Sequence, residues 1–212
     1  MIALHPHPLL RLLWINAEFP DGLDAESPTD LIESLQVGAS SPFAVDDDIK
    51  KSVRDLLRHG GFKPSGRNKP ASEYLIKAAG RGGLSTINLA VDICNVVSLH
   101  SGIPISVVDR TRLEGKLRVD VAEKGEGYIF NASGQVLDLS GLICLFDDQG
   151  ACANAVKDSQ RTKTHSDTRE VVFLFWAPSR YASRADLAGD WMQSWLVSLG
   201  ANVLGKGIES AT

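Results

Sequence analysis

The chain has 212 residues, of which 43% are hydrophobic and 23% charged, and its formal net charge is −4. This composition is typical of a globular protein with one domain, and the small negative charge gives no overall sign of nucleic-acid binding. No apolar run approaches the ~20 residues that a membrane-spanning helix requires, so we expect no membrane partner. The cysteines Cys94, Cys144 and Cys152 form no C-x-x-C pair, and the five histidines form no H-x-x-x-H pair. We therefore expect a cytoplasmic protein without a disulfide framework, a metal site or a cofactor.

Charge is unevenly distributed along the sequence. Residues 1–49 carry one basic residue, Arg11, against nine acidic ones, whereas residues 50–81 carry nine lysines and arginines against Asp55 and Glu73. A local basic block attracts phosphate groups, which makes the stretch 50–81 a candidate contact for RNA. The alternative is that this stretch forms two solvated helices whose lysines face water.

The first part of the chain predicts one strand followed by helices. Residues 1–20 lack a basic leader and a small-residue cleavage site, so we expect an early strand there rather than a signal peptide. The acidic stretch 1–45 is interpreted as an extension with a short helix capped near Thr29 or Asp30. The other helices expected before the centre of the chain are 46–59 and 72–80.

A buried central helix with a polar stripe is expected next. Asn88, Asp92 and Asn95 are spaced i, i+4 and i+7, which places them on one helix face, and nearly every residue between them is apolar. Polar groups inside a core need partners, so these side chains either fix neighbouring backbone or line a pocket. The expected caps of this helix are Ser85 or Thr86 at its start and Gly102 at its end.

After the central helix the hydrophobic pattern changes to alternation, which predicts strands. The expected strands are 103–108, 116–121, 127–131, 135–139, 142–146 and 171–176. A polar loop over 147–170 separates the last two and is long enough to be functional or mobile. A closing helix over 183–200, with Ser183 as N-cap, precedes a tail that is expected to be disordered from Gly205. This order indicates an α+β fold with mostly antiparallel sheets packed with helices.

Short motifs between residues 61 and 178 occur in an order that resembles a known domain. They are Pro70-Ala71-Ser72-Glu73, Leu84 to Asn88 leading into Val91-Asp92-Ile93-Cys94-Asn95, Gly102-x-Pro104 to Asp109, Glu114-Gly115, Lys124-Gly125-Glu126, Ser133-Gly134, and Asp158-Ser159-Gln160-Arg161-Thr162 to Thr168. The set resembles the B3/B4 domain, which is the tRNA-editing domain of the beta subunit of phenylalanyl-tRNA synthetase. It is most similar to small free-standing bacterial proteins built from that domain alone. We therefore expect a single B3/B4-like domain with a core over 61–178, an acidic extension over 1–45 and a C-terminal helix over 183–200.

The resemblance implies hydrolysis of the ester bond of wrongly charged tRNA. It also implies an amino acid in a pocket near the helix-to-strand corner, and tRNA or aminoacyl-tRNA as partner through the stretch 50–81. Ser106 stands where the synthetase domain has a histidine, and Ser133 replaces an aspartate before Gly134. Thr168 matches a threonine that gauges the size of the amino acid. The paired glycines of the synthetase loop are missing and Ala153 to Arg161 stands there instead.

Such a hydrolysis needs a positioned water and a polarised carbonyl rather than a protein nucleophile. The candidate catalytic residues are Ser106, Asp109 and Thr168. The candidate substrate-binding residues are Asn95, Ser133, Gly134, Asp158, Arg161 and Thr168.

Structural alternatives stay open for each candidate. Asn95 can cap the corner, Asp109 can form a turn, and Asp158 and Arg161 can pair with each other. If the loss of the family histidine at Ser106 abolishes catalysis, the chain is a non-catalytic module that binds an amino acid or aminoacyl-tRNA. A further alternative is an interaction protein with a vestigial pocket.

Overall fold

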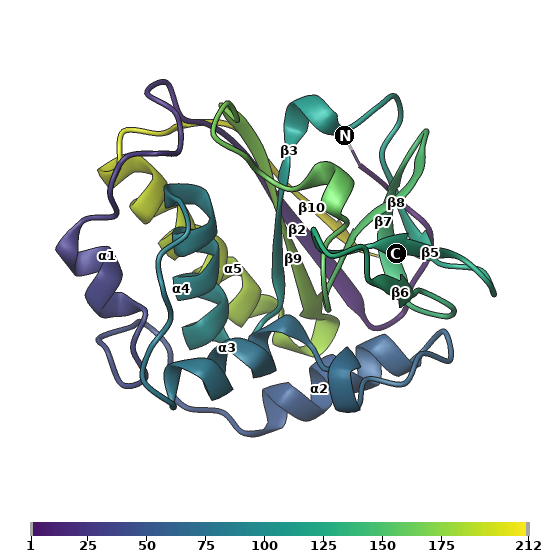
Figure 1. Cartoon of the computed structure of the whole chain (residues 1–212). Helices are drawn as coiled ribbons and strands as arrows, with labels where there is room; N and C mark the ends of the chain where they lie inside the picture. The colour runs from purple at the N-terminus through teal and green to yellow at the C-terminus, as the bar shows by residue number, and fades with distance from the viewer. Residues whose placement is uncertain (1, 211–212) are drawn as a thin grey trace.

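The computed structural model describes residues 2–210, and in this part of the chain two four-stranded sheets and a hairpin pack with helices (Figure 1). The larger sheet has the order β10-β2-β9-β3, and all its pairings are antiparallel. Its strands are β10 (Asn202–Ser210), β2 (Leu10–Glu18), β9 (Glu170–Pro178) and β3 (Ile105–Asp109). The predicted α+β fold with mostly antiparallel sheets is confirmed.

The smaller sheet has the order β1-β4-β7-β8, with β1 parallel to β4 and the other pairings antiparallel. Its strands are β1 (Ala3–Leu4), β4 (Arg118–Val121), β7 (Ile143–Asp147) and β8 (Gly150–Asn154), and the separate hairpin is β5 (Gly127–Ile129) with β6 (Val136–Asp138). The prediction of one continuous loop over 147–170 is therefore wrong, because this segment contains β8 and a short 3-10 helix at Gln160–Thr162.

The two long central strands of the larger sheet, β2 and β9, divide their buried side chains between two cores. In β9, Phe173 and Phe175 belong to one apolar cluster, whereas Leu174 and Trp176 belong to the other. This division follows from the alternation of side chains along a strand. Each fully buried aliphatic or phenylalanine side chain contributes about 1.5–3 kcal/mol, so β9 is a main source of stability.

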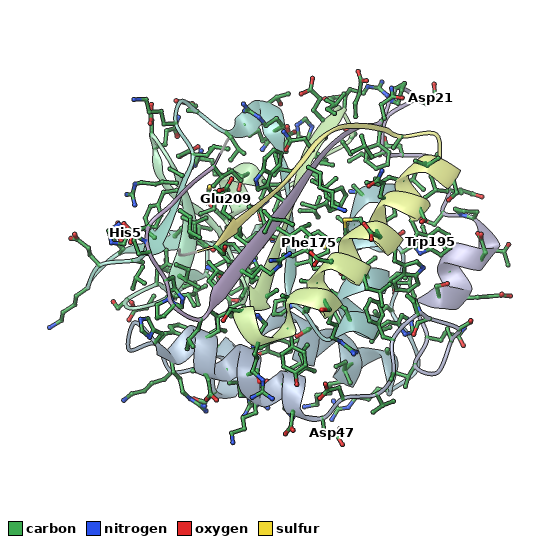
Figure 2. The ribbon with its side chains drawn as sticks, turned by 180° about the vertical axis from the view of Figure 1, so that it is seen from behind. His5, Asp21, Asp47, Phe175, Trp195 and Glu209 are labelled. Atoms are coloured by element: carbon green, nitrogen blue, oxygen red, sulfur yellow. The ribbon has the colours of Figure 1, made fainter. Side chains whose placement is uncertain are left out.

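Helices cover one face of the larger sheet, and the smaller sheet lies on the other side. The helices are α1 (Thr29–Ser34), α2 (Asp48–Arg58), α3 (Ala71–Ala79), α4 (Leu89–Ser101) and α5 (Ala182–Ser198). Figure 2, seen from behind, shows α5 with Trp195 lying over the sheet that carries Phe175. Both residues belong to or pack against the same apolar cluster, together with Met192. Among residues 2–210, no helix is both long and apolar enough to cross a membrane.

Polar side chains fix the ends of α4, the helix beside β3. Asn88 is the N-cap and accepts a hydrogen bond from Val91 N at 3.0 Å, so the expected caps at Ser85 or Thr86 are wrong. Asp92 is fully buried and accepts bonds from Ser27 Oγ at 2.6 Å and Ile87 N at 2.9 Å. Asp92 therefore fixes neighbouring chain rather than lining a pocket.

A glycine ends α4 as expected. Gly102 adopts φ 73°, a left-handed conformation that glycine takes without strain. The chain then turns through Pro104 into β3, which is the corner that the sequence indicated.

The early strand predicted within residues 1–20 is confirmed as β2, but both ends of the chain belong to the core more fully than the sequence predicted. The tail predicted to be disordered from Gly205 instead forms most of β10, which pairs with β2 from Asn202 to Ser210. The acidic segment predicted as an extension contains β2, an inner strand of the larger sheet. The core thus reaches beyond 61–178 at both ends.

Two predicted helix caps are also wrong. The N-cap of α1 is Pro28 rather than Thr29 or Asp30, and that of α5 is Tyr181 rather than Ser183.

Candidate functional site

The predicted site residues on β3 lie on opposite faces of that strand. Ser106 and Asp109 are three residues apart, an odd spacing that directs their side chains to opposite sides. Their neighbours agree, because Val107 packs in the core below the helices and Val108 in the core toward the smaller sheet. The structure thus distributes the predicted catalytic residues between two separate polar clusters.

Ser106 joins a cluster that we call the Asp158 cluster, which comprises Ser106, Asn154, Asp158 and Trp176. Ser106 Oγ lies 2.7 Å from Asp158 Oδ1 and 3.1 Å from the Asn154 carbonyl oxygen, and Trp176 Nε1 donates to it at 2.9 Å. A hydroxyl has one proton, and the charged carboxylate is the stronger acceptor for it. Ser106 is only 1% exposed, so it holds Asp158 rather than meeting a ligand itself.

Asp158 has an unusual ionisation within this cluster. Burial raises its pKa to about 7, although hydrogen bonds from Ser106 and Asn154 and the charge of Lys163 act in the opposite direction. The residue as a whole is partly exposed. Ser106 Oγ and Asn154 N both bond to Oδ1, and the backbone amide of Val107 also acts to lower the pKa of the carboxyl group. A carboxyl group of this kind is able to accept a proton from water or a hydrogen bond from an ammonium group near neutral pH.

The helix α4 borders the Asp158 cluster. Burial and then the charge of Asp158 raise the pKa of the Cys94 thiol, which donates to the Ile105 carbonyl oxygen at 3.3 Å. Asn88 Nδ2 bonds to Thr164 Oγ1 at 3.2 Å, which ties the start of α4 to the segment after Asp158. The predicted residue Asn95 lies half-buried on this helix, without a hydrogen bond to the cluster.

Asp109 and Thr168 meet in a second cluster, the Asp109 cluster, which comprises Asp109, Thr111, His165 and Thr168. Asp109 is fully buried and accepts bonds from Thr168 Oγ1 at 2.5 Å and from Thr111 N at 2.8 Å. Burial acts to raise the pKa of Asp109, but the hydrogen bonds from both threonines and the charge of His165 hold it below its usual value. Asp109 therefore forms a turn, which was one of the structural alternatives. Its bond with Thr168 also fixes the chain just before β9.

His165 is bound on both sides in the Asp109 cluster. Its Nε2 lies 3.1 Å from Asp109 Oδ2, and its Nδ1 accepts a hydrogen bond from Asp167 N at 3.2 Å. Both ring nitrogens are thus occupied by contacts with Asp109 and Asp167. The contacts therefore indicate a structural role for His165.

Arg161 pairs with Asp147, so the alternative in which it pairs with Asp158 is not what the structure shows. Two guanidinium nitrogens contact the two carboxylate oxygens at 2.9 and 2.8 Å, and Asp147 also accepts from the Glu114 amide at 3.0 Å. Burial acts to raise the pKa of Asp147, but Arg161 and these amides hold it below its usual value. Arg161 lines an open cleft of about 630 Å³ together with Tyr128 and residues of β8, away from Ser106.

Ser133 and Gly134 lie apart from both clusters, in the exposed turn between β5 and β6. Ser133 Oγ bonds to Asn131 Oδ1 at 3.0 Å, and Gly134 adopts φ 75°, as the turn requires. Phe130, at the loop end of this hairpin, accepts a bond through its carbonyl oxygen from Lys163 Nζ at 2.6 Å, and the charge of Lys163 acts on Asp158.

The basic stretch 50–81 is only partly neutralised within the described residues. Glu73 forms a bidentate pair with Arg54 at 2.6 Å and lies 3.8 Å from Lys50, and Arg58 pairs with Asp55 at 2.8 Å. Within residues 2–210, six cations of this stretch form no ion pair: Lys51, Lys63, Arg67, Lys69, Lys77 and Arg81.

One of these cations, Arg67, lies near Lys157, the residue before Asp158. The pKa of Lys157 is lowered by burial and then by the charge of Arg67. Ala71 N donates to the Ala155 carbonyl oxygen at 2.8 Å, which joins the start of α3 to the end of β8. Lys157 therefore places positive charge next to Asp158 in the sequence, and Arg67 places positive charge near Lys157 in space.

Three residues that make key hydrogen bonds or ion pairs with the predicted site residues were not predicted from the sequence. Trp176 looked like an apolar strand residue, Asp147 like the first residue of a loop, and Asn154 like one of many polar loop residues. Only the position of Asn154 two residues before Val156 gave a local signal, because its Oδ1 accepts the amide of that residue at 2.8 Å, which is an Asx turn.

The fold and these clusters define a small α+β domain with the Asp158 carboxyl group at the edge of β3, within the influence of the Lys163 charge. The family model described as the B3/4 domain matches residues 63–187. The chain belongs to the B3/4 domain family.

Curated relatives of the chain are much longer proteins. The phenylalanine–tRNA ligase beta subunit of Streptomyces avermitilis is 30% identical over 158 residues, which are 72% of this chain and 18% of the relative. The corresponding subunit of Bartonella henselae is 30% identical over 108 residues, which are 50% of this chain and 13% of the relative. The chain thus spans less than a fifth of the curated relatives that it matches.

A comparison of structures found an N-terminal fragment of the phenylalanyl-tRNA synthetase beta subunit from Pyrococcus horikoshii. It has a TM-score of 0.48 and 13% sequence identity, and the match covers 91% of this chain and 46% of the fragment.

Proposed function

We propose that the chain is a trans-editing hydrolase, which cleaves the ester bond between a wrong amino acid and a tRNA. Membership in the B3/4 domain family and the similarity to phenylalanine–tRNA ligase beta subunits support this class of substrate. The observation that carries the proposal is Asp158, a carboxyl group at the outer edge of β3 that Ser106 and Asn154 hold in place and whose pKa burial raises to about 7.

Asp158 acts as the general base in this proposal. Its carboxylate accepts a proton from water while the water oxygen forms a bond to the ester carbonyl carbon. The bond between that carbon and the ribose oxygen then breaks, and the proton passes to the ribose oxygen. A base with a pKa near neutral pH suits both proton transfers. Lys163 offsets the negative charge that develops on the carbonyl oxygen, as its charge already acts on Asp158.

The remaining predicted residues act at a distance from the reacting atoms. Ser106, fixed by Trp176, orients the carboxylate of Asp158. Asp109 and Thr168 fix the start of β9, so we now assign them positioning roles. The unpaired cations of the 50–81 stretch and Lys157 supply charge for the acceptor end of a tRNA.

The test is a panel of tRNAs, each charged with a wrong amino acid, incubated with the wild type and with Asp158→Asn. We expect at least one wrong ester to be hydrolysed, and the variant to be at least about a hundredfold slower. Asp167→Asn is the matched control, because Asp167 belongs to the same segment and its side chain is 90% exposed. If the wild type leaves every ester in the panel intact, the enzymatic proposal is lost.

RNA binding is tested separately with Lys63, Arg67 and Lys69 replaced by glutamine. Removing a cation that binds a phosphate lowers the affinity and reduces the slope of affinity against salt by about one. Arg58→Gln is the control, since Arg58 already pairs with Asp55. Equal affinities for all these variants would remove this segment from the interface.

A non-catalytic binding module is the second candidate, and the state of Ser106 favours it. Ser106 stands at the position of the family histidine, and its hydroxyl is already hydrogen-bonded to Asp158 and Trp176. A module of this kind would be stabilised against heat by an amino acid without hydrolysing any ester.

A further inference from the structure

A pocket of about 390 Å³ lies where β1 and β2 meet the segment between β3 and β4. Its polar and aromatic lining consists of Trp14 and Asn16 from β2 and of Arg110 and Lys116 from that segment. A volume of this size is within the range of pockets that bind small molecules. Trp14 and Asn16 lie outside residues 63–187, so the match to the B3/4 domain does not account for this pocket.

The indole ring of Trp14 is held flat against the last strand of the chain. Trp14 is opposite Gly207 in the pairing of β2 with β10, and its ring packs on the backbone of that glycine and of Gly205. A Cβ atom at Gly207 would lie 2.5 Å from Cζ2 of the ring, so only glycine leaves room for the ring there. The indole N–H is buried but the residue as a whole is half-buried, so a ligand meets ring carbons. The ring therefore offers a fixed apolar surface on which a planar group can stack.

Two cations of the lining form no ion pair among residues 2–210. Arg110 is half-buried and Lys116 is exposed. Asp148 accepts a bond from the Lys116 amide at 3.2 Å, so one carboxylate stands beside two cations and a net positive charge remains. The guanidinium fork of arginine matches the oxygens of a phosphate group. The amide of Asn16 is two residues after Trp14 on the same face of β2, and it adds a donor and an acceptor.

We propose that this pocket binds a nucleotide, with the base stacked on Trp14 and a terminal phosphate held by Arg110 and Lys116. The combination of groups determines the class of ligand. An aromatic ring alone accepts any planar apolar group, and two cations alone accept any anion, whereas a nucleotide carries a planar base and a doubly charged phosphate together. The source of this chemistry is either a free nucleoside monophosphate or the phosphorylated end of an RNA strand. The proposal does not depend on hydrolysis at Asp158.

The experiment is calorimetry of the full chain with adenosine monophosphate, with adenosine and with ribose 5-phosphate. We expect one nucleotide per chain. Adenosine lacks the phosphate and ribose 5-phosphate lacks the base, so each should bind at least about tenfold more weakly than the nucleotide. A trinucleotide with a 5′-phosphate distinguishes the two sources. Tighter binding of the trinucleotide than of the free nucleotide supports an RNA end as the natural ligand, and weaker binding supports a free nucleotide.

Variants assign the two parts of the ligand to their residues. Arg110→Gln should weaken the binding of adenosine monophosphate at least about tenfold and leave the affinity for adenosine unchanged. Trp14→Leu should weaken the binding of both ligands. Arg112→Gln is the matched control, because Arg112 is on the same 3-10 helix as Arg110 but its guanidinium bonds to the Arg161 carbonyl oxygen. This control should bind as the wild type does.

The arginine variant protects the test against misfolding. Arg110 forms no ion pair among residues 2–210, so Arg110→Gln is expected to fold even if Trp14→Leu does not. Wild-type affinity for adenosine monophosphate in Arg110→Gln, or in a folded Trp14→Leu, would overturn the proposal. Equal affinities of the wild type for the nucleotide and for adenosine would also overturn it, as would no binding at millimolar concentration. A loss in Arg112→Gln as large as that in Arg110→Gln would show that the effect is not specific to this pocket and would overturn it as well.

Discussion

Replacing Asp158 with asparagine is expected to stabilise the protein above neutral pH. The pKa of Asp158 is about 7 in the folded protein, against a reference value of 3.8. Because the folded pKa is raised, the contribution of this group to stability is fully present below pH 3.8 and is lost as the pH rises through about 7. Asparagine has no proton to lose at this site, so the variant avoids that loss.

The expected gain follows from the size of the pKa difference. A shift of about three units corresponds to about 4 kcal/mol when all of it is expressed as stability. Asp158 is partly exposed, and solvent screening reduces this figure, so we expect about 1–3 kcal/mol at pH 8. The amide oxygen of asparagine can still accept the bonds from Ser106 Oγ and Asn154 N, so little packing is lost.

Urea unfolding of the wild type and the variant, followed by tryptophan fluorescence, measures the effect at a series of pH values. The difference in unfolding free energy between the two proteins should be near zero at pH 4 and should grow up to pH 8. A difference that stays constant across the series would show that Asp158 does not titrate as the structure indicates. A variant that is less stable than the wild type at pH 8 would show that the protein needs the charged carboxylate for folding.

Three further substitutions test the contacts around the clusters, each by urea unfolding at pH 7. Arg161→Met leaves the fully buried Asp147 carboxylate without its partner and should destabilise by about 3 kcal/mol, the lower end for a broken buried pair, because Arg161 is itself 30% exposed. A loss of stability smaller than that caused by breaking a surface ion pair would contradict this prediction for Arg161→Met. Asn88→Ala removes the N-cap of α4 and should cost about 1 kcal/mol; no loss would show that another group caps the helix. Thr168→Val keeps the shape but removes the hydroxyl that donates to Asp109, so we expect a loss of about 1–3 kcal/mol, and an unchanged stability would remove Thr168 from the Asp109 cluster.

Much of the fold could be predicted from sequence because its signals are local. The apolar run that became β9 and the glycine that ends α4 depend on neighbouring residues only. The strand β10 was missed because its glycines, Gly205 and Gly207, lower strand propensity. Both pack against the Trp14 ring, a contact with a distant residue that no local pattern reveals.

The candidate site was predictable in its residues but not in their partners. Asp158, Ser106 and Thr168 were all predicted to be site residues, but the sequence assigned all three to the same pocket. Side-chain direction on β3 could not be fixed from sequence, because both faces of this strand are buried and the apolar pattern does not distinguish them. The pairing of Arg161 with Asp147 depends on how β7 and β8 meet, which is a long-range feature.

The position of Asp158 beside an edge strand gives the strongest reason to expect a function for it. β3 is the last strand of its sheet, and its outer edge is covered by the Cys94 thiol and by the segment that carries Asp158. An asparagine in place of Asp158 would supply the same acceptor for Ser106 without the loss of stability above pH 7. A more stable and inactive Asp158→Asn variant would be the trade-off expected of a catalytic group that selection for activity has kept at the expense of stability. A more stable variant with full activity would leave the carboxylate of Asp158 without a role in either folding or catalysis.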